Sequence, residues 1–180
     1  MKKISTLVAV MLCTLAAMAT NYDGQLTVTV NGEASQQEAN ITLEQNDSGY
    51  KFILKNFIFQ AGEDKMGIGN IVLDSLTASP LYGYSVITAE QDVEITNGDD
   101  PSIDTWVGPM LGAVPVKLSA SFVGDALDVT ISIYMATLEQ NIQVHFFGTA
   151  PAGLKGDLNA DGTVNVTDVT VLIEQILAGN

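Results

Sequence analysis

The residues best suited to a defined chemistry lie close together near the C-terminus, in residues 156–179. Carboxylate and amide side chains alternate there, and a helix-like apolar pattern follows. Ca²⁺ takes roughly six to eight oxygen ligands, which a calcium loop supplies from positions 1, 3, 5, 7, 9 and 12, with glycine at position 6. The spacing predicts a Ca²⁺ site whose ligands are, in that order, Asp157, Asn159, Asp161, the main-chain carbonyl of Thr163, Asn165 and Asp168, with Gly162 at the turn. The alternative is an Asx-rich turn that only caps the helix.

This loop departs from the general pattern at its last position, where Asp168 stands in place of the usual Glu. With that residue, the segment GDLNADGTVNVTDVTVLI resembles one repeat of a type I dockerin, the module that docks cellulosomal proteins onto cohesins. The resemblance implies a cohesin-bearing scaffold protein as partner, in a setting of extracellular polysaccharide breakdown. It also implies that Val166 and Thr167 help to contact that partner.

A full dockerin has two such repeats, whereas the pattern occurs once in this chain. The helix after the loop has an apolar stripe without a second repeat to cover it. We therefore expect the stripe to pack on the rest of the protein, on a second copy of the chain in a dimer, or on another protein. Its residues are Val169, Leu172, Ile173, Ile176 and Leu177.

The N-terminus has the residue order of a secretory signal peptide. Lys2 and Lys3 precede an apolar run at residues 4–18, and an Ala-Met-Ala triplet ends at Ala19. We expect residues 1–19 to be removed and the protein to be secreted, periplasmic or on the cell surface. The dockerin resemblance indicates a bacterial host. The apolar run is too short to span a membrane comfortably.

The charge and cysteine content exclude several classes of function. The chain has 21 acidic and seven basic residues, for a net charge of −14. A nucleic-acid partner is not expected, because neutralising phosphates needs a basic face. The single cysteine, Cys13, lies in the predicted signal peptide. Its removal leaves no thiol for catalysis, for a disulfide or for a thiolate metal site.

The central region, residues 20–148, has the alternating pattern of β-strands, with turn residues between them. It predicts an all-β domain, most simply an antiparallel up-and-down β-barrel, followed by a linker at residues 149–155 and the calcium repeat at residues 156–180. A jelly roll or an immunoglobulin-like sandwich is the competing architecture, although the Cys–Trp–Cys pattern of the latter is missing. The candidate strands are residues 25–30, 41–44, 50–55, 69–73, 84–88, 92–96, 116–122, 127–134 and 142–147.

Three short sequence segments within this region carry a second resemblance. They are YDGQLTVTVNGE at residues 22–33, LKNF at 54–57 and VPVKL at 114–118. Together they look like the calycin-like, lipocalin-related secreted domains of gut Bacteroidetes. The resemblance implies an eight-stranded barrel whose mouth holds a small apolar ligand. It brings no catalytic residues.

Catalytic interpretations of the central region are weaker than structural ones. His145 is the only histidine and is expected to be structural or on the surface, because no nucleophile motif accompanies it. The acidic residues between Glu90 and Asp104 favour a solvated loop over a glycosidase pair, which needs two carboxylates held across a cleft. Four aromatic residues, Tyr50, Tyr82, Tyr84 and Trp106, are either core or a platform for a sugar or ligand.

These observations predict a secreted, non-catalytic binding or assembly protein. Its C-terminal repeat would bind Ca²⁺ and dock a partner, with the barrel as cargo or as a binder of a small ligand. The alternative is a lipocalin-like carrier of a small apolar ligand, in which the calcium loop only stabilises the C-terminus.

Overall fold

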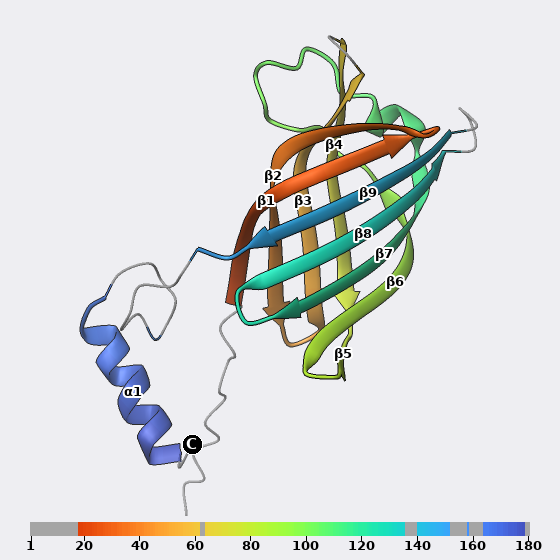
Figure 1. The fold of residues 1–180 in the computed structure, drawn as a ribbon. Coiled ribbons are helices and arrows are strands. Elements are labelled where there is room, and N and C mark those ends of the chain that lie inside the picture. Colours follow the sequence, from red (N-terminus) through yellow and green to blue (C-terminus); the bar gives the residue numbers. More distant parts are fainter. Residues whose placement is uncertain (1–17, 62–63, 136–139, 152–157, 159–163, 179–180) are drawn as a thin grey trace, which may run out of the picture.

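The structure is a computed structural model and describes residues 18–61, 64–135, 140–151, 158 and 164–178. Its described part has nine strands, one 3₁₀ turn and one α-helix (Figure 1). The elements are β1 Met18–Val30, β2 Glu33–Asn46, β3 Gly49–Ala61, β4 Asp64–Leu76, β5 Ala78–Leu81, β6 Tyr84–Glu94, η1 Gly108–Leu111, β7 Ala113–Val123, β8 Ala126–Met135, β9 Gln140–Thr149 and α1 Val166–Ala178.

The nine strands form one antiparallel sheet in the order β4-β3-β2-β1-β9-β8-β7-β6-β5, which curls into a half-barrel (Figure 1). Consecutive strands are neighbours except for β4 and β5, which are the two ends of the sheet, and the first and last strands pair with each other. The break in the sheet therefore falls in mid-chain, between β4 and β5. The predicted all-β, up-and-down architecture is confirmed, with nine strands in place of the eight that the calycin resemblance implied.

Two details of the strands differ from the sequence-based expectation. Residues 84–88 and 92–96 were expected as two strands, but β6 runs unbroken through most of them because no Gly or Pro interrupts the segment. The short strand β5 was not expected, since it contains Pro80. Proline is tolerated there because β5 is the edge strand of the sheet.

Side chains along the strands point alternately inward and outward, and the inward ones fill the half-barrel. In β7 and β9, every second residue is buried and its neighbours face outward. The largest fully buried side chains, Phe52, Phe57 and Phe146, come from strands on both sides of β1. The interior is a packed apolar core, and the outer face carries the charged and polar residues together with some exposed apolar ones such as Tyr134 and Phe147.

Two gaps interrupt the pairing around the barrel. The first, which we call the β2/β3 split, begins above the pair Ile41↔Leu54, where the β2–β3 ladder ends. Beyond that point β2 pairs only with β1, and β3 pairs only with β4. The second, which we call the β4/β6 seam, lies at the mid-chain break, where Asn70 and Thr96 form an isolated bridge.

Helix α1 lies to one side of the sheet (Figure 1). All five side chains of its predicted apolar stripe are exposed by 44% or more. The sheet therefore does not bury the stripe, which removes the first of the three expected coverings. Within the described residues, no helix combines the length and apolar character needed to cross a membrane.

Candidate functional site

The β2/β3 split opens a cleft of about 400 Å³ near one end of the barrel. Residues 37–40 of β2 form one wall, residues 54–58 of β3 form the other, and Asp100 of the loop after β6 completes the rim. Figure 1 shows β3 and β4 continuing upward at this end while β1 and β2 turn away. The cleft therefore exists because two hairpins of one sheet diverge.

The lining of the cleft changes from apolar to polar between floor and rim. Leu54 and Phe57 belong to the buried core, and the half-buried Ala39 packs against that core. Glu38 and Lys55 are exposed at the rim. An apolar floor with a few polar groups around it is the usual chemistry of a small-ligand site.

Asn56 shapes the β3 wall. Leu54 and Phe57 both point into the core although they are three residues apart, because the β3–β4 register shifts between them. Asn56 adopts a left-handed conformation there, with φ of 51°. Its main-chain N–H donates to Asn70 Oδ1 at 2.9 Å.

The side chain of Asn56 ties this bulge to the loop after β6. Its amide Nδ2 donates to Asp99 Oδ1 at 2.6 Å, and its Oδ1 accepts the Asp99 N–H at 2.8 Å. Asn56 was not expected as a site residue from the sequence. The available signal was that Asn56, a polar residue, interrupts the alternation of β3.

Asp100 keeps a negative charge at the rim. The main-chain N–H of Ser102 donates to its Oδ1 at 2.8 Å. This bond, then the Ser102 hydroxyl, and to a smaller extent Lys65 lower the pKa of the Asp100 carboxyl. Carboxylates at Glu38 and Asp100 thus face a single cation of the lining, Lys55.

The four aromatic residues of the predicted platform are not brought together. Trp106 lies against Gly67 and Gly98, at the beginning of β4. Tyr50 pairs with Leu76 at the far end of β4 and packs on Phe122, with ring centroids 5.5 Å apart. Nine residues of extended strand separate these two places, a distance of roughly 30 Å. Tyr82 and Tyr84 lie at the turn between β5 and β6.

The remaining polar candidates lie on the outer face. His145 is exposed, as expected, and its Nε2 is 3.3 Å from Asp128 Oδ2. Glu90, Asp92 and Glu94 all point outward from β6. Over the residues that the structure describes, no three His, Cys, Asp or Glu side chains are grouped to hold a metal ion.

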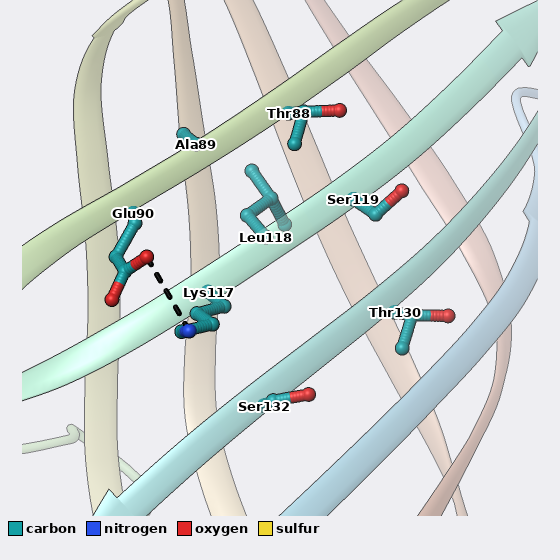
Figure 2. Close-up of a pocket in the computed structure, with 8 residues that line it drawn as sticks. All are labelled: Thr88, Ala89, Glu90, Lys117, Leu118, Ser119, Thr130 and Ser132. Carbon is teal, nitrogen blue, oxygen red and sulfur yellow. Dashed lines mark ion pairs between the residues drawn. The ribbon is translucent and has the colours of Figure 1, made fainter.

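A second hollow, of about 300 Å³, lies on the outer face of β6, β7 and β8 (Figure 2). Short hydroxyl side chains line it, and Lys117 pairs with Glu90 at 3.4 Å. Leu118 points away from it into the core. This groove lies over a continuous, fully paired part of the sheet, and an ion pair already joins two of its residues, so it is less suited to a ligand than the cleft between diverging strands.

Of the predicted calcium ligands, Asn165 and Asp168 are described, and the other four lie outside the described residues. Asp168 is only 3% exposed. Its Oδ1 accepts the Leu158 N–H and its Oδ2 accepts the Asn165 N–H, both at 2.7 Å. A buried carboxylate that joins both ends of the loop fits the closing position of a calcium loop.

Asn165 immediately precedes α1 and acts as its N-cap. Its Oδ1 accepts the main-chain N–H of Thr167 at 2.8 Å and the Thr167 hydroxyl at 2.7 Å. The predicted partner-contacting residue Val166 is 76% exposed at the first turn of the helix. This arrangement accounts for where the helix begins.

A family pattern agrees with the architecture of the sheet. No curated protein sequence matches the chain. Among solved structures, the chain is similar to the ywiB protein from Bacillus subtilis, with 9% identity, a TM-score of 0.33, and coverage of 76% of this chain and 96% of that one. A likeness this weak supports no argument. The family pattern of the Calycin-like beta-barrel domain matches residues 18–149, from the first residue of β1 to the last residue of β9. The chain belongs to the Calycin-like beta-barrel domain family.

Proposed function

We propose that the protein is a non-catalytic binding protein that holds a small ligand in the cleft at the β2/β3 split. A calycin-like barrel suggests small-ligand binding. The observation that carries the proposal is the opening between two unpaired strand segments, where the half-buried Ala39 and Ile58 offer accessible apolar surface beside the buried core. The apolar part of a ligand would lie on Ala39 and Ile58, and its polar groups would meet the rim.

Filling the cleft tests this proposal. Ala39 points toward the core at the mouth, so Ala39→Trp should abolish saturable binding of a neutral apolar fluorophore such as phenylnaphthylamine. Ala113→Trp is the control, because Ala113 is exposed at the start of β7. Circular dichroism checks that both variants fold. Equal binding by Ala39→Trp and wild type would refute the cleft as the site.

We also propose that residues 157–168 bind Ca²⁺ and that α1 then docks a partner, either a cohesin-type scaffold or a second copy of the chain. The support is the buried carboxylate of Asp168, which bridges Leu158 and Asn165, together with the exposed apolar stripe of α1. A bound Ca²⁺ would compensate the negative charge of the loop's carboxylates. This proposal includes export to the outside of the cell, because Ca²⁺ is abundant there.

Calorimetry with Ca²⁺ tests the loop. Wild type should release or absorb heat on binding, Asp161→Ala should not, and Asp92→Ala on the exposed face of β6 should behave like wild type. No heat from wild type, or the same heat from Asp161→Ala, contradicts Ca²⁺ binding.

The carrier alternative, in which the loop only stabilises the C-terminus, is separated from docking by the association state. Sedimentation with and without Ca²⁺ should show a dimer, or a complex with an added cohesin, only if α1 docks. Fluorophore binding that survives deletion of residues 156–180 without any Ca²⁺-dependent association supports the carrier.

A further inference from the structure

We infer that the ligand of the β2/β3 cleft is an extended peptide segment, which adds to the free edge of β2 as a strand and carries a basic side chain beside Glu38. The inference rests on the proposed function, since it uses the same cleft, and it names the chemical class of the ligand. It comes from the direction in which the main chain of β2 points.

The turn between β1 and β2 fixes that direction. Asn31 and Gly32 both have positive φ, of 51° and 91°, as a two-residue type I′ turn requires. The flanking residues Val30 and Glu33 of such a hairpin exchange both main-chain hydrogen bonds, and alternate residues repeat this pattern. The register runs unbroken from Val30↔Glu33 to Met18↔Gln45. The residues whose main chain bonds to β1 are therefore Glu33, Ser35, Gln37 and Ala39.

The residues between them point their N–H and C=O groups the other way, into the split. These are Ala34, Gln36, Glu38 and Asn40, and all four are exposed. The β2–β3 ladder stops just before them, at Ile41↔Leu54. Across the described ranges, no main-chain partner faces these four residues from the side of β3. They form an unpaired strand edge, which is the element that an added peptide strand recognises.

The side chains around this edge specify the peptide further. The added strand's inward side chains would meet Ala39, which packs on the core, so they should be apolar. Its outward side chains would lie beside Glu38, with Asp100 across the cleft. The lining holds two carboxylates and one lysine, Lys65 acts on Asp100 from outside it, and the chain has a net charge of −14, so Glu38 is the carboxylate that favours Lys or Arg beside it.

Residue-resolved hydrogen exchange gives the test. The probe is a seven-residue peptide of alternating valine and threonine, with a central lysine and blocked ends. In the free protein, the amides of Ser35, Gln37 and Ala39 should exchange at least tenfold more slowly than those of Gln36 and Glu38. Saturating peptide should slow the latter two at least tenfold. The same peptide with alternate N-methyl groups should bind at least tenfold more weakly.

A pair of proline variants controls for the fold. Gln36→Pro removes an N–H that faces the split and leaves the β1 ladder intact, so it should fold and lose peptide binding. Gln37→Pro removes a ladder N–H, so it should lower the melting temperature instead. Unchanged peptide affinity in Gln36→Pro, or slow exchange at Gln36 and Glu38 without peptide, overturns the inference.

The two proposals for the cleft can fail separately. If phenylnaphthylamine binds wild type and not Ala39→Trp while the peptide binds neither, the cleft is a ligand site and the strand-addition inference is wrong. If neither probe binds wild type, both are wrong.

Discussion

The barrel has two gaps, which differ in the hydrogen bonds that cross them. At the β4/β6 seam, Asn70 and Thr96 exchange main-chain hydrogen bonds of 2.8 and 3.2 Å, and the Val107 N–H donates to Gly67 O at 2.8 Å. Farther along, Gln91 Nε2 donates to the main-chain oxygen of Asp74 at 2.8 Å. At the β2/β3 split, the described residues show no bond between the strand edges above Ile41↔Leu54.

The β4/β6 seam is an interrupted ladder, whereas no ladder crosses the β2/β3 split above Ile41↔Leu54. The pairs Asn70↔Thr96 and Ala78↔Ile87 differ by one residue of register, so β4 and β5 together follow β6 like one bent strand. The loop that fills the remaining space, residues 95–112, packs against glycines of β4. Main-chain and side-chain hydrogen bonds thus cross the seam, whereas none of the described residues pairs with the edge of β2 in the split.

The largest effect on the free energy of unfolding is expected from adding a side chain at the β4/β6 seam. A Cβ on Gly69 would collide with the Thr96 main-chain oxygen, and Gly69 has a φ of 127° that side chains rarely adopt. Gly69→Ala should destabilise the fold by about 3 kcal/mol. Gly83→Ala is the control, with φ of 87° and open space around it. It should cost about 1 kcal/mol. Urea unfolding measures both, and equal losses would mean that the seam is not tightly packed.

A smaller effect is expected where the loop holds one wall of the cleft. Asn56→Ala removes two hydrogen bonds to Asp99 and should cost about 2 kcal/mol. Asn56→Gly loses the same bonds but tolerates φ of 51°, so it should cost about 1 kcal/mol less. Lys55→Ala, at the exposed rim beside it, should change the free energy of unfolding by less than about 0.5 kcal/mol. A Gly variant as unstable as the Ala variant would show that conformation plays no part.

The smallest effect at neutral pH is expected from Tyr22→Phe. Tyr22 pairs with Ile41 in the continuous sheet just below the split. Burial first, then the charges of Tyr50 and Asp125, raise the pKa of Tyr22. Its protonated form is thus stabilised by folding, and that stability is full below the unfolded pKa of about 10 and is lost as pH rises through the folded pKa. Urea midpoints at pH 8 and pH 11 should fall more for wild type than for Tyr22→Phe. Parallel losses in the two proteins would contradict this assignment.

Local pattern predicted most of the sheet, because alternation and turn residues act over a few positions. Residues 25–30 and the strands of the C-terminal half were confirmed in this way. The cleft was not predictable, since it depends on where two hairpins diverge and on a bulge at Asn56. The ties between residues 95–112 and β4 also join segments that are distant in sequence, so no short pattern records them. Ca²⁺ binding remains a prediction.

The pairing of β1 with β9 has a consequence for how the chain folds. Every other ladder joins consecutive strands, whereas this one joins the two ends of the domain. Closing so long a loop costs conformational entropy before any contact repays it, so this step should set the folding rate. The break at Thr77 offers natural new termini, because β4 and β5 do not pair with each other. A circular permutant opened there would keep every ladder and turn the slowest pairing into a hairpin.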